Sequence, residues 1–383
     1  MSADDATQAT VVRRDVPLLS VGGLAKHFAD RGLFKRGNAV VRAVDGVSFE
    51  VAEGETLALV GESGCGKSTT GRLVTRLIEP SAGWVRYRDE DLTHLRGRKL
   101  LPYRRKLQII FQDPYASLNP RMTVADVLGE LLRIHKLASG PGVERRIAEL
   151  LDMVGLPASH ARRYPHEFSG GQRQRVGIAR ALALDPRLIV CDEPVSALDV
   201  SVQAQIVNLL KDIQDELDLS YLFISHDLMV VRHMADRIAV MYLGRIVETA
   251  PTDDLFATPR HPYTRALLNV IPLPNPELRT ARQVVEGDVP SPIAPPPGCH
   301  FHPRCPFATE RCTVEAPHLQ LVDVDHSVAC HRWQEIPAFA GTAAVDAGEV
   351  NPHLARLQAY FSAKRRAKAE PRATGVAPSP LQT

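Results

Sequence analysis

The chain has no long apolar run and no excess of one charge, and its first residues lack the pattern expected of a leader sequence. None of its apolar stretches approaches the roughly 18 residues that a membrane-spanning helix needs. The first residues are polar and acidic, and they have neither the basic nor the apolar region of a signal peptide. We therefore expect a soluble, cytoplasmic chain whose contact with any membrane comes through a partner.

The balance of charge excludes another class of function. Lys and Arg together number 46 and Asp and Glu 44, so the net charge of +2 gives no reason to expect nucleic acid as the main partner. Aromatic residues make up only 5% of the chain, whereas hydrophobic residues make up 44%, which is enough for a sizeable core. We expect a globular protein without a nucleic-acid partner.

A glycine-rich loop is the first feature with a chemistry of its own. The stretch Gly61-Glu-Ser-Gly-Cys-Gly-Lys-Ser68 fits the phosphate-loop pattern G-x-x-x-x-G-K-[ST] and follows the apolar strand pattern of Thr56–Val60. Its glycines allow backbone N–H groups to point at phosphates, and a helix starting at Lys67 adds its positive end. We expect Lys67 to reach the β- and γ-phosphates and Ser68 to bind Mg²⁺. The predicted nucleotide-binding residues here are Gly61, Ser63, Gly64, Cys65, Gly66, Lys67, Ser68 and Thr69, with Cys65 acting through its backbone.

Acidic and polar residues end three further apolar stretches. Asp192 and Glu193 follow residues 188–191, where one carboxylate can hold Mg²⁺ and the second can orient the attacking water. Gln112 could contact both Mg²⁺ and water, and His226 could contact the γ-phosphate. The predicted catalytic residues are Glu193, His226 and Gln112, and the predicted Mg²⁺ ligands are Ser68, Gln112 and Asp192.

A second glycine-rich stretch, Ser169-Gly170-Gly171-Gln172, precedes a helical pattern. Small residues with free N–H groups at a helix start form another anion site. One chain needs only one such site, so the second predicts a site shared between two subunits, and hence a dimer with two ATP molecules at its interface. The alternative is a glycine-rich cap for the helix.

Changes in composition and hydrophobic pattern along the chain predict four parts. Residues 1–17 are polar and expected to be disordered. Residues 18–259 alternate strands and helices, which predicts an α/β domain with a parallel sheet, and a helical subdomain is expected over about 92–176. Prolines become frequent after residue 260, so 260–333 should form a separate, irregular module. Residues 334–383 are expected to be a variable, mostly disordered tail.

Four of the six cysteines crowd into this irregular module: Cys299, Cys305, Cys312 and Cys330. In a cytosolic protein such a cluster favours a metal over disulfides. The spacings do not fit a C-x₂-C zinc site. We interpret the four thiols first as ligands of a [4Fe–4S] cluster, second as a zinc site in which nearby histidines could substitute, and third as residues held by packing alone.

With these motifs in this order, the chain resembles the ATP-binding cassette (ABC) transporter ATPases over about residues 18–333. The resemblance implies a P-loop NTPase fold with a RecA-like parallel-sheet core, an antiparallel β-subdomain and an inserted helical subdomain. Phe168 stands where the signature usually has Leu, and we expect little effect because both are apolar. The family's motifs map to Walker A at Gly61–Ser68, the Q-loop at Gln112, the signature at Phe168–Gln172, Walker B at Leu188–Asp192, the catalytic Glu193, the D-loop at Ser196–Asp199, with Asp199 at the nucleotide site, and the switch His226.

Three stretches are similar to the ATPases of bacterial oligopeptide, dipeptide and nickel importers: Phe111–Met122, His261–Leu267 and Cys299–Phe307. This resemblance implies an ATP-hydrolysing subunit, peripheral on the cytoplasmic face of the inner membrane, that energises uptake of di- or oligopeptides. The implied partners are two membrane permease subunits, a second related or identical ABC ATPase subunit, and an extracytoplasmic solute-binding protein. A coupling helix of a permease would dock around residues 112–130.

Some alternatives stay open. The family stacks an aromatic residue on the base of ATP, for which Phe28 is preferred and Phe34, in what looks like an insertion over Ala29–Asn38, is the alternative. An importer of nickel or another small solute, and a non-transport ABC ATPase of DNA repair or translation, are the alternative functions. The solute itself and the choice between a homodimer and a heterodimer do not follow from the sequence.

Overall fold

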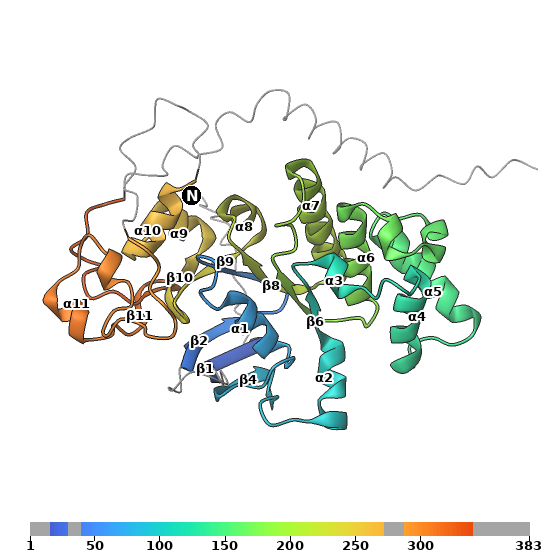
Figure 1. Ribbon diagram of the computed structural model, residues 1–383, viewed down its shortest axis with the longest axis horizontal. Coiled ribbons are helices and arrows are strands. Elements are labelled where there is room, and N and C mark those ends of the chain that lie inside the picture. Colours follow the sequence, from blue (N-terminus) through green and yellow to red (C-terminus); the bar gives the residue numbers. More distant parts are fainter. Residues whose placement is uncertain (1–15, 30–39, 272–286, 340–383) are drawn as a thin grey trace, which may run out of the picture.

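The computed structural model describes residues 16–29, 40–271 and 287–339, which form two sheets and the helices around them (Figure 1). Nearly all of the predicted N-terminal segment, Phe34 and most of the predicted tail lie outside these residues. Within the described ranges, no helix combines the length and the apolar character needed to cross a membrane.

The smaller sheet is antiparallel and forms the predicted β-subdomain. Its strands are β1 (Leu19–Ala29), β2 (Val40–Val51), β4 (Ala82–Tyr87) and β5 (Glu90–Asp91), in the order β2-β1-β4-β5. Leu19, Val21 and Leu24 of β1 are buried, so this sheet turns an apolar face to the core.

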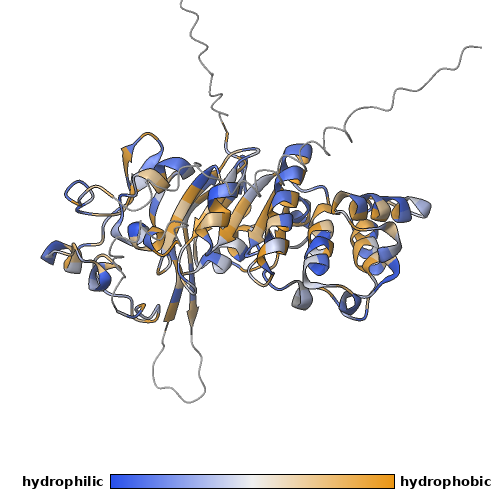
Figure 2. Cartoon of the chain, turned by 90° about the horizontal axis from the view of Figure 1, so that it is seen from above, coloured by the Kyte–Doolittle hydropathy of each residue, from blue (hydrophilic) through white to orange (hydrophobic). Residues whose placement is uncertain are grey.

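The larger sheet contains the parallel core. The order of its strands is β11-β12-β10-β9-β3-β8-β7-β6. Within the run β9-β3-β8-β7-β6, each strand pairs in parallel with the next. Every residue of β7 and β8 is buried, as expected for parallel strands covered on both faces. Figure 2 shows hydrophobic residues along the strands in the middle of the molecule. The strands are β3 (Thr56–Val60), β6 (Leu107–Ile110), β7 (Leu188–Asp192), β8 (Ser220–Ser225), β9 (Arg237–Tyr242), β10 (Arg245–Pro251), β11 (Gln320–Asp323) and β12 (His326–Val328).

Helix α1 (Lys67–Val74) begins at the predicted lysine and packs closely on the parallel core. A Cβ atom at Gly71 would lie 2.8 Å from Val190 of β7 and 2.9 Å from Ile224 of β8, so a larger residue would push the helix off the sheet. The other helices of this part are α7 (Val200–Leu217), α8 (Leu228–Met234), α9 (Thr252–Ala257) and α10 (Pro262–Asn269).

A group of helices projects from one end of the sheet, as predicted (Figure 1). It contains α3 (Pro114–Ser117), α4 (Val124–Ile134), α5 (Pro141–Met153) and α6 (Gly170–Leu182). The range predicted for this subdomain, from about residue 92, also takes in α2 (Leu101–Lys106) and β6. Because β6 pairs with β7, the helical group begins only after that strand.

The C-terminal module continues the large sheet, which the expectation of an irregular, separate module did not include. Strand β12 pairs antiparallel with β10, β11 pairs with β12, and the short helix α11 (Glu310–Val314) precedes them. Both strands are short, so they leave little periodic signal in the sequence. Phe301 is only 1% exposed and belongs to the same hydrophobic core as β7 and β8.

A buried carboxylate joins this module to the cassette. Glu248 of β10 is fully buried and accepts hydrogen bonds from the backbone N–H groups of Arg260 and His261. Nε2 of His326, on β12, lies 2.8 Å from the Oε1 atom of the same carboxylate. One side chain therefore ties β10, the start of α10 and β12 together.

We predict that Glu248→Ala lowers the free energy of unfolding by about 3–5 kcal/mol, because removing one partner leaves His326 and two backbone N–H groups buried without an acceptor. Denaturant unfolding of the purified chain measures this. Glu315→Ala is the matched control, since Glu315 pairs with Arg311 on the surface of the same module, and it should leave the transition nearly unchanged. Equal effects of the two substitutions would contradict this role for Glu248.

Candidate active site

The phosphate loop is pressed between two strands, and glycine is required where it touches them. A Cβ atom at Gly61 would lie 2.1 Å from the carbonyl oxygen of Met241, and one at Gly66 would lie 2.1 Å from that of Ala43. Gly66 also has a left-handed φ of 107° at the start of α1. The backbone of β9 and β2 therefore sets the shape of the loop.

The lysine of the loop lies inside it. Lys67 is only 4% exposed, and its Nζ donates to the carbonyl oxygens of Gly61, at 2.8 Å, and Glu62, at 3.0 Å. The Cys65 thiol lies 3.8 Å from Nζ, and burial raises its pKa. Ser63 and Gly64 are at the exposed tip of the loop, and Thr69 is half-buried in the first turn of α1. An ammonium group is thus present where the phosphates of a nucleotide would lie.

Ser68 and Asp192 form the start of a Mg²⁺ site. The Ser68 hydroxyl donates to Oδ1 of Asp192 at 2.7 Å, which brings together the two oxygen ligands that a phosphate-bound Mg²⁺ would use. Asp192 is 1% exposed, and burial raises the pKa of its carboxyl group. These residues fit the ion. Gln112, the third predicted ligand, donates to Glu193 through its Nε2 atom.

The three predicted catalytic residues meet at one oxygen atom. Oε2 of Glu193 accepts a hydrogen bond from Nε2 of Gln112 at 2.9 Å and lies 3.3 Å from Nδ1 of His226. These residues follow the carboxyl ends of β6, β7 and β8, which lie side by side. Glu193 has a φ of 47°, a left-handed conformation that costs free energy for a residue other than glycine. Its N–H donates to the carbonyl of Ile224 at 3.0 Å, which holds this conformation.

The second glycine-rich stretch starts α6. Ser169 caps the helix: its hydroxyl accepts from the N–H of Gln172, and the Gln172 side chain accepts from the N–H of Ser169. A Cβ atom at Gly171 would lie 2.4 Å from Val202 of α7, so this glycine allows the two helices to approach. Gly170 packs beside Leu198, and Asp199 precedes α7 without capping it through its side chain. Phe168 is buried against His160, with ring centroids 5.4 Å apart.

Among the described residues, the structure thus brings the phosphate loop, Asp192, Glu193, Gln112 and His226 into one site, whereas Ser169–Gln172 contact α7 and the loop before it.

Phe28, the preferred base-stacking residue, lies near the end of β1 opposite Val41 and is 42% exposed. Its ring is thus accessible at the surface of the β-subdomain.

The four C-terminal cysteines line one cavity of about 20 Å³, together with His302 and His331. They are free thiols, and burial raises the pKa of Cys305 to about 11 and that of Cys330 to about 12. Within the described residues, no three His, Cys, Asp or Glu side chains are arranged to hold a metal ion. The four thiols lie around one cavity, but their arrangement is not that of a site for one ion.

Sequence reasoning missed two residues at the phosphate loop. Arg304 pairs with Glu62, and the Tyr263 hydroxyl accepts a hydrogen bond from the N–H of Glu62 at 2.8 Å. Arg304 and Glu62 are 242 positions apart, so no local pattern could have indicated the pair.

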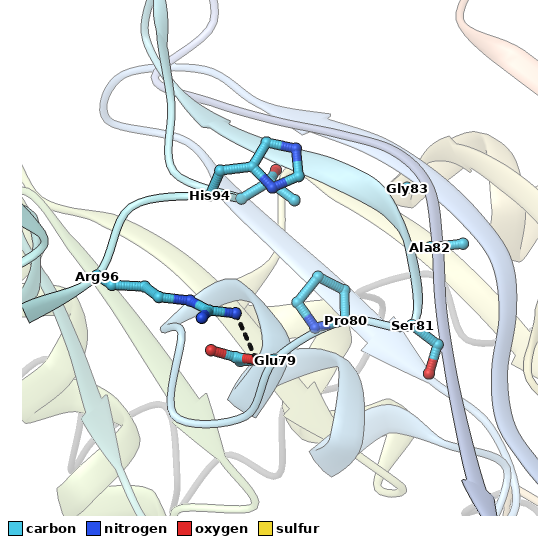
Figure 3. A pocket seen from close by; sticks show the side chains of 8 residues that line it. Glu79, Pro80, Ser81, Ala82, Gly83, His94 and Arg96 are labelled. Atoms are coloured by element: carbon cyan, nitrogen blue, oxygen red, sulfur yellow. Dashed lines mark hydrogen bonds and ion pairs between the residues drawn. The ribbon is translucent and has the colours of Figure 1, made fainter.

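A larger hollow of about 400 Å³ opens elsewhere, at the start of β4 (Figure 3). Glu79 and Arg96 pair across it at 3.4 Å, and Pro80, Ser81 and His94 lie around it. None of the predicted site residues lines this hollow.

The comparisons with known proteins agree with this geometry. Residues 44–196 match the family described as ABC transporter, and residues 247–312 match the one described as oligopeptide/dipeptide transporter, C-terminal region. A protein of Brucella ovis named as a peptide import ATP-binding protein is 53% identical over 83% of this chain and 98% of its own length. The oligopeptide transport ATP-binding protein AppF of Bacillus subtilis is 49% identical over 82% and 97%.

Solved structures show the same fold. The ATP-binding cassette MJ0796, in a dimeric post-hydrolysis structure with ADP and phosphate, matches with a TM-score of 0.55 and 30% identity. The match covers 61% of this chain and 98% of that one. Together with the relatives, it shows that this chain belongs to the ABC transporter ATPases, in the group that carries the oligopeptide/dipeptide transporter C-terminal region.

Proposed function

We propose that this chain is the ATP-hydrolysing subunit of a bacterial importer and drives uptake of di- or oligopeptides through partner membrane subunits. The observation that carries the ATPase is the meeting of Gln112 and His226 at Oε2 of Glu193, next to the pair of Asp192 and Ser68. The matched C-terminal region and the names of the relatives support peptide import over nickel import or a role in DNA repair or translation.

In the hydrolysis step, the oxygen of a water molecule bonds to the γ-phosphorus while the bond from that phosphorus to the β–γ bridging oxygen breaks. Glu193 accepts a hydrogen bond from this water and takes its proton as the new bond forms. Because both neighbours contact Oε2, we assign Oε1 to the water. Gln112 and His226 orient the carboxylate, and Lys67 contributes positive charge at the phosphates.

Ser68 and Asp192 would hold Mg²⁺, which supplies positive charge against the negative charge of the transferred phosphoryl group. Ser169–Gln172 and Asp199 would complete the site of a second ABC ATPase subunit, identical or related, in a dimer with two ATP molecules. The capped, exposed start of α6 supports this proposal, as does the dimeric state of the similar cassette MJ0796.

We predict that Glu193→Gln binds ATP but lowers kcat at least about 100-fold, because an amide cannot take the proton of the water. The ATP-bound dimer should accumulate, since hydrolysis no longer reopens it. Phosphate release and size-exclusion chromatography with Mg-ATP measure the two effects.

Glu216→Gln is the control for this substitution, because Glu216 is an exposed glutamate of α7. It should retain full activity. Undiminished hydrolysis by Glu193→Gln would contradict the proposed mechanism.

The membrane partners of the importer would be two permease subunits, supplied with solute by an extracytoplasmic binding protein, and the chain would lie on the cytoplasmic face of the inner membrane. The proposed docking region for a permease helix spans residues 112–130. Tyr115 of α3 is 54% exposed there, and the Arg173 guanidinium lies over its ring at 5.1 Å. An exposed aromatic ring held in place by α6 is suited to contact a partner helix.

We predict that Tyr115→Ser reduces peptide uptake and co-purification with the permease subunits, because it removes an exposed contact. The ATPase rate of the isolated chain should stay within about twofold, as for other surface substitutions. Ile134→Ser, at the far end of α4 and 60% exposed, is the control and should keep uptake. Equal uptake by both variants would show that the permease docks elsewhere.

For the C-terminal cysteines we propose a [4Fe–4S] cluster with a structural role. Its support is chemical: four thiols from Cys299, Cys305, Cys312 and Cys330 converge on one cavity without forming disulfides. Zinc is the second candidate, because the spacings of the four cysteines do not fit a C-x₂-C zinc site.

We predict that anaerobically purified protein absorbs broadly near about 400 nm and contains iron and sulfide at about four each per chain. Cys312→Ser should lose this absorbance, whereas Cys191→Ala, in the buried strand β7, should retain it. A colourless protein with zinc or without metal would contradict the cluster and leave the ATPase proposal intact.

A further inference from the structure

An arginine of the C-terminal module reaches into the phosphate loop. Arg304 ends the 3₁₀ turn His302–Arg304, directly before Cys305. Its Nη1 and Nη2 atoms lie 2.9 Å and 3.0 Å from the two carboxylate oxygens of Glu62. The Arg304 side chain is only 8% exposed, so this two-point contact is shielded from water.

Aromatic side chains fix the direction of this guanidinium. It lies over the rings of Tyr242 and Phe301, at 6.0 Å and 5.9 Å, and Nη1 is 3.4 Å from the Tyr242 hydroxyl. Tyr242, Tyr263 and Phe301 pack on one another with centroids 4.6 to 5.4 Å apart. Arg304 therefore has little freedom to leave Glu62.

Glu62 is held from two sides. Its carboxylate binds Arg304, and its N–H donates to the hydroxyl of Tyr263, on α10, at 2.8 Å. Its carbonyl oxygen accepts from Lys67, the lysine expected at the phosphates. The position of Glu62 thus affects both the backbone of the loop and the ammonium group inside it.

The charge of Glu62 is the reason that this contact matters for ATP. A carboxylate within a loop that binds three phosphates repels the ligand, and the repulsion is strong in a partly buried site. Arg304 neutralises this charge, and the hydrogen bond with Glu62 raises the pKa of the guanidinium above its already high value. The Arg304–Glu62 pair therefore reduces the negative charge that the phosphates of a nucleotide would meet in this loop.

We propose that Arg304 is a positioning residue for ATP binding, through which residues 287–339 set the nucleotide affinity of the cassette. Arg304 does not touch the reacting atoms. It neutralises Glu62 and holds the first turn of the phosphate loop. The inference rests on ATP binding at Gly61–Ser68 and not on the identity of the transported solute or on a bound metal.

The test is a double-mutant cycle of Arg304 and Glu62 in the full-length chain. The affinity for Mg-ATP is measured by displacement of a fluorescent ATP analogue. Arg304→Gln should raise Kd about tenfold, because it leaves the Glu62 charge beside the phosphates. Glu62→Gln should stay within about twofold of the unmodified chain, and the double variant should return to the Glu62→Gln value. The loss in Arg304→Gln should shrink as salt is raised.

Two further variants serve as controls, one for poor folding and one for the loss of a positive charge elsewhere in the module. Arg304→Lys retains the charge and should keep most of the affinity even if Arg304→Gln folds poorly. Arg311→Gln removes an exposed arginine of the same module, paired with Glu315, and should change nothing.

The outcomes separate this inference from the proposed function. If the double variant binds as weakly as Arg304→Gln, or if Arg304→Gln binds normally, the inference is wrong while the ATPase remains. If the unmodified chain does not bind Mg-ATP at all, the proposed function fails.

Discussion

The catalytic site depends on the parallel register of β6, β7 and β8. Ile110 of β6 pairs with Cys191 of β7, and Asp192 pairs with Ile224 of β8. This register brings Gln112, Glu193 and His226 to the same edge, where they share one carboxylate oxygen. A slip by one residue would turn alternate side chains to the opposite face and separate the three. The complete burial of β7 and β8 makes such a slip costly.

Much of this arrangement could be predicted from the sequence, because its signals are local. The start of α1 at Lys67, the strands β3, β7 and β8 and the cap at Ser169 each follow from a short motif beside an apolar run. Parallel strands that end in polar residues place those residues at one edge. The sequence could therefore indicate that Gln112, Glu193 and His226 lie at one edge, although it could not indicate that Gln112 and His226 contact the same oxygen atom of Glu193.

The rest could not be predicted, because it consists of contacts between distant positions. Glu62 and Arg304 are 242 positions apart, and Glu248 and His326 are 78 apart. Each of these residues alone looks like an ordinary surface charge, and only the packing of the C-terminal module against β10 and the phosphate loop buries it. Short strands such as β11 and β12 also leave too few residues for a periodic pattern to appear.

The pairing of β12 with β10 has a consequence for association between chains. Without the C-terminal module, β10 would present unpaired backbone N–H and C=O groups, which can pair with the same edge of another molecule. Among the described residues, the last strand on this side of the sheet is β11, only four residues long and ending in Asp323, and a short strand with a charge resists such pairing. The module therefore closes an edge of the sheet through which two chains could otherwise associate.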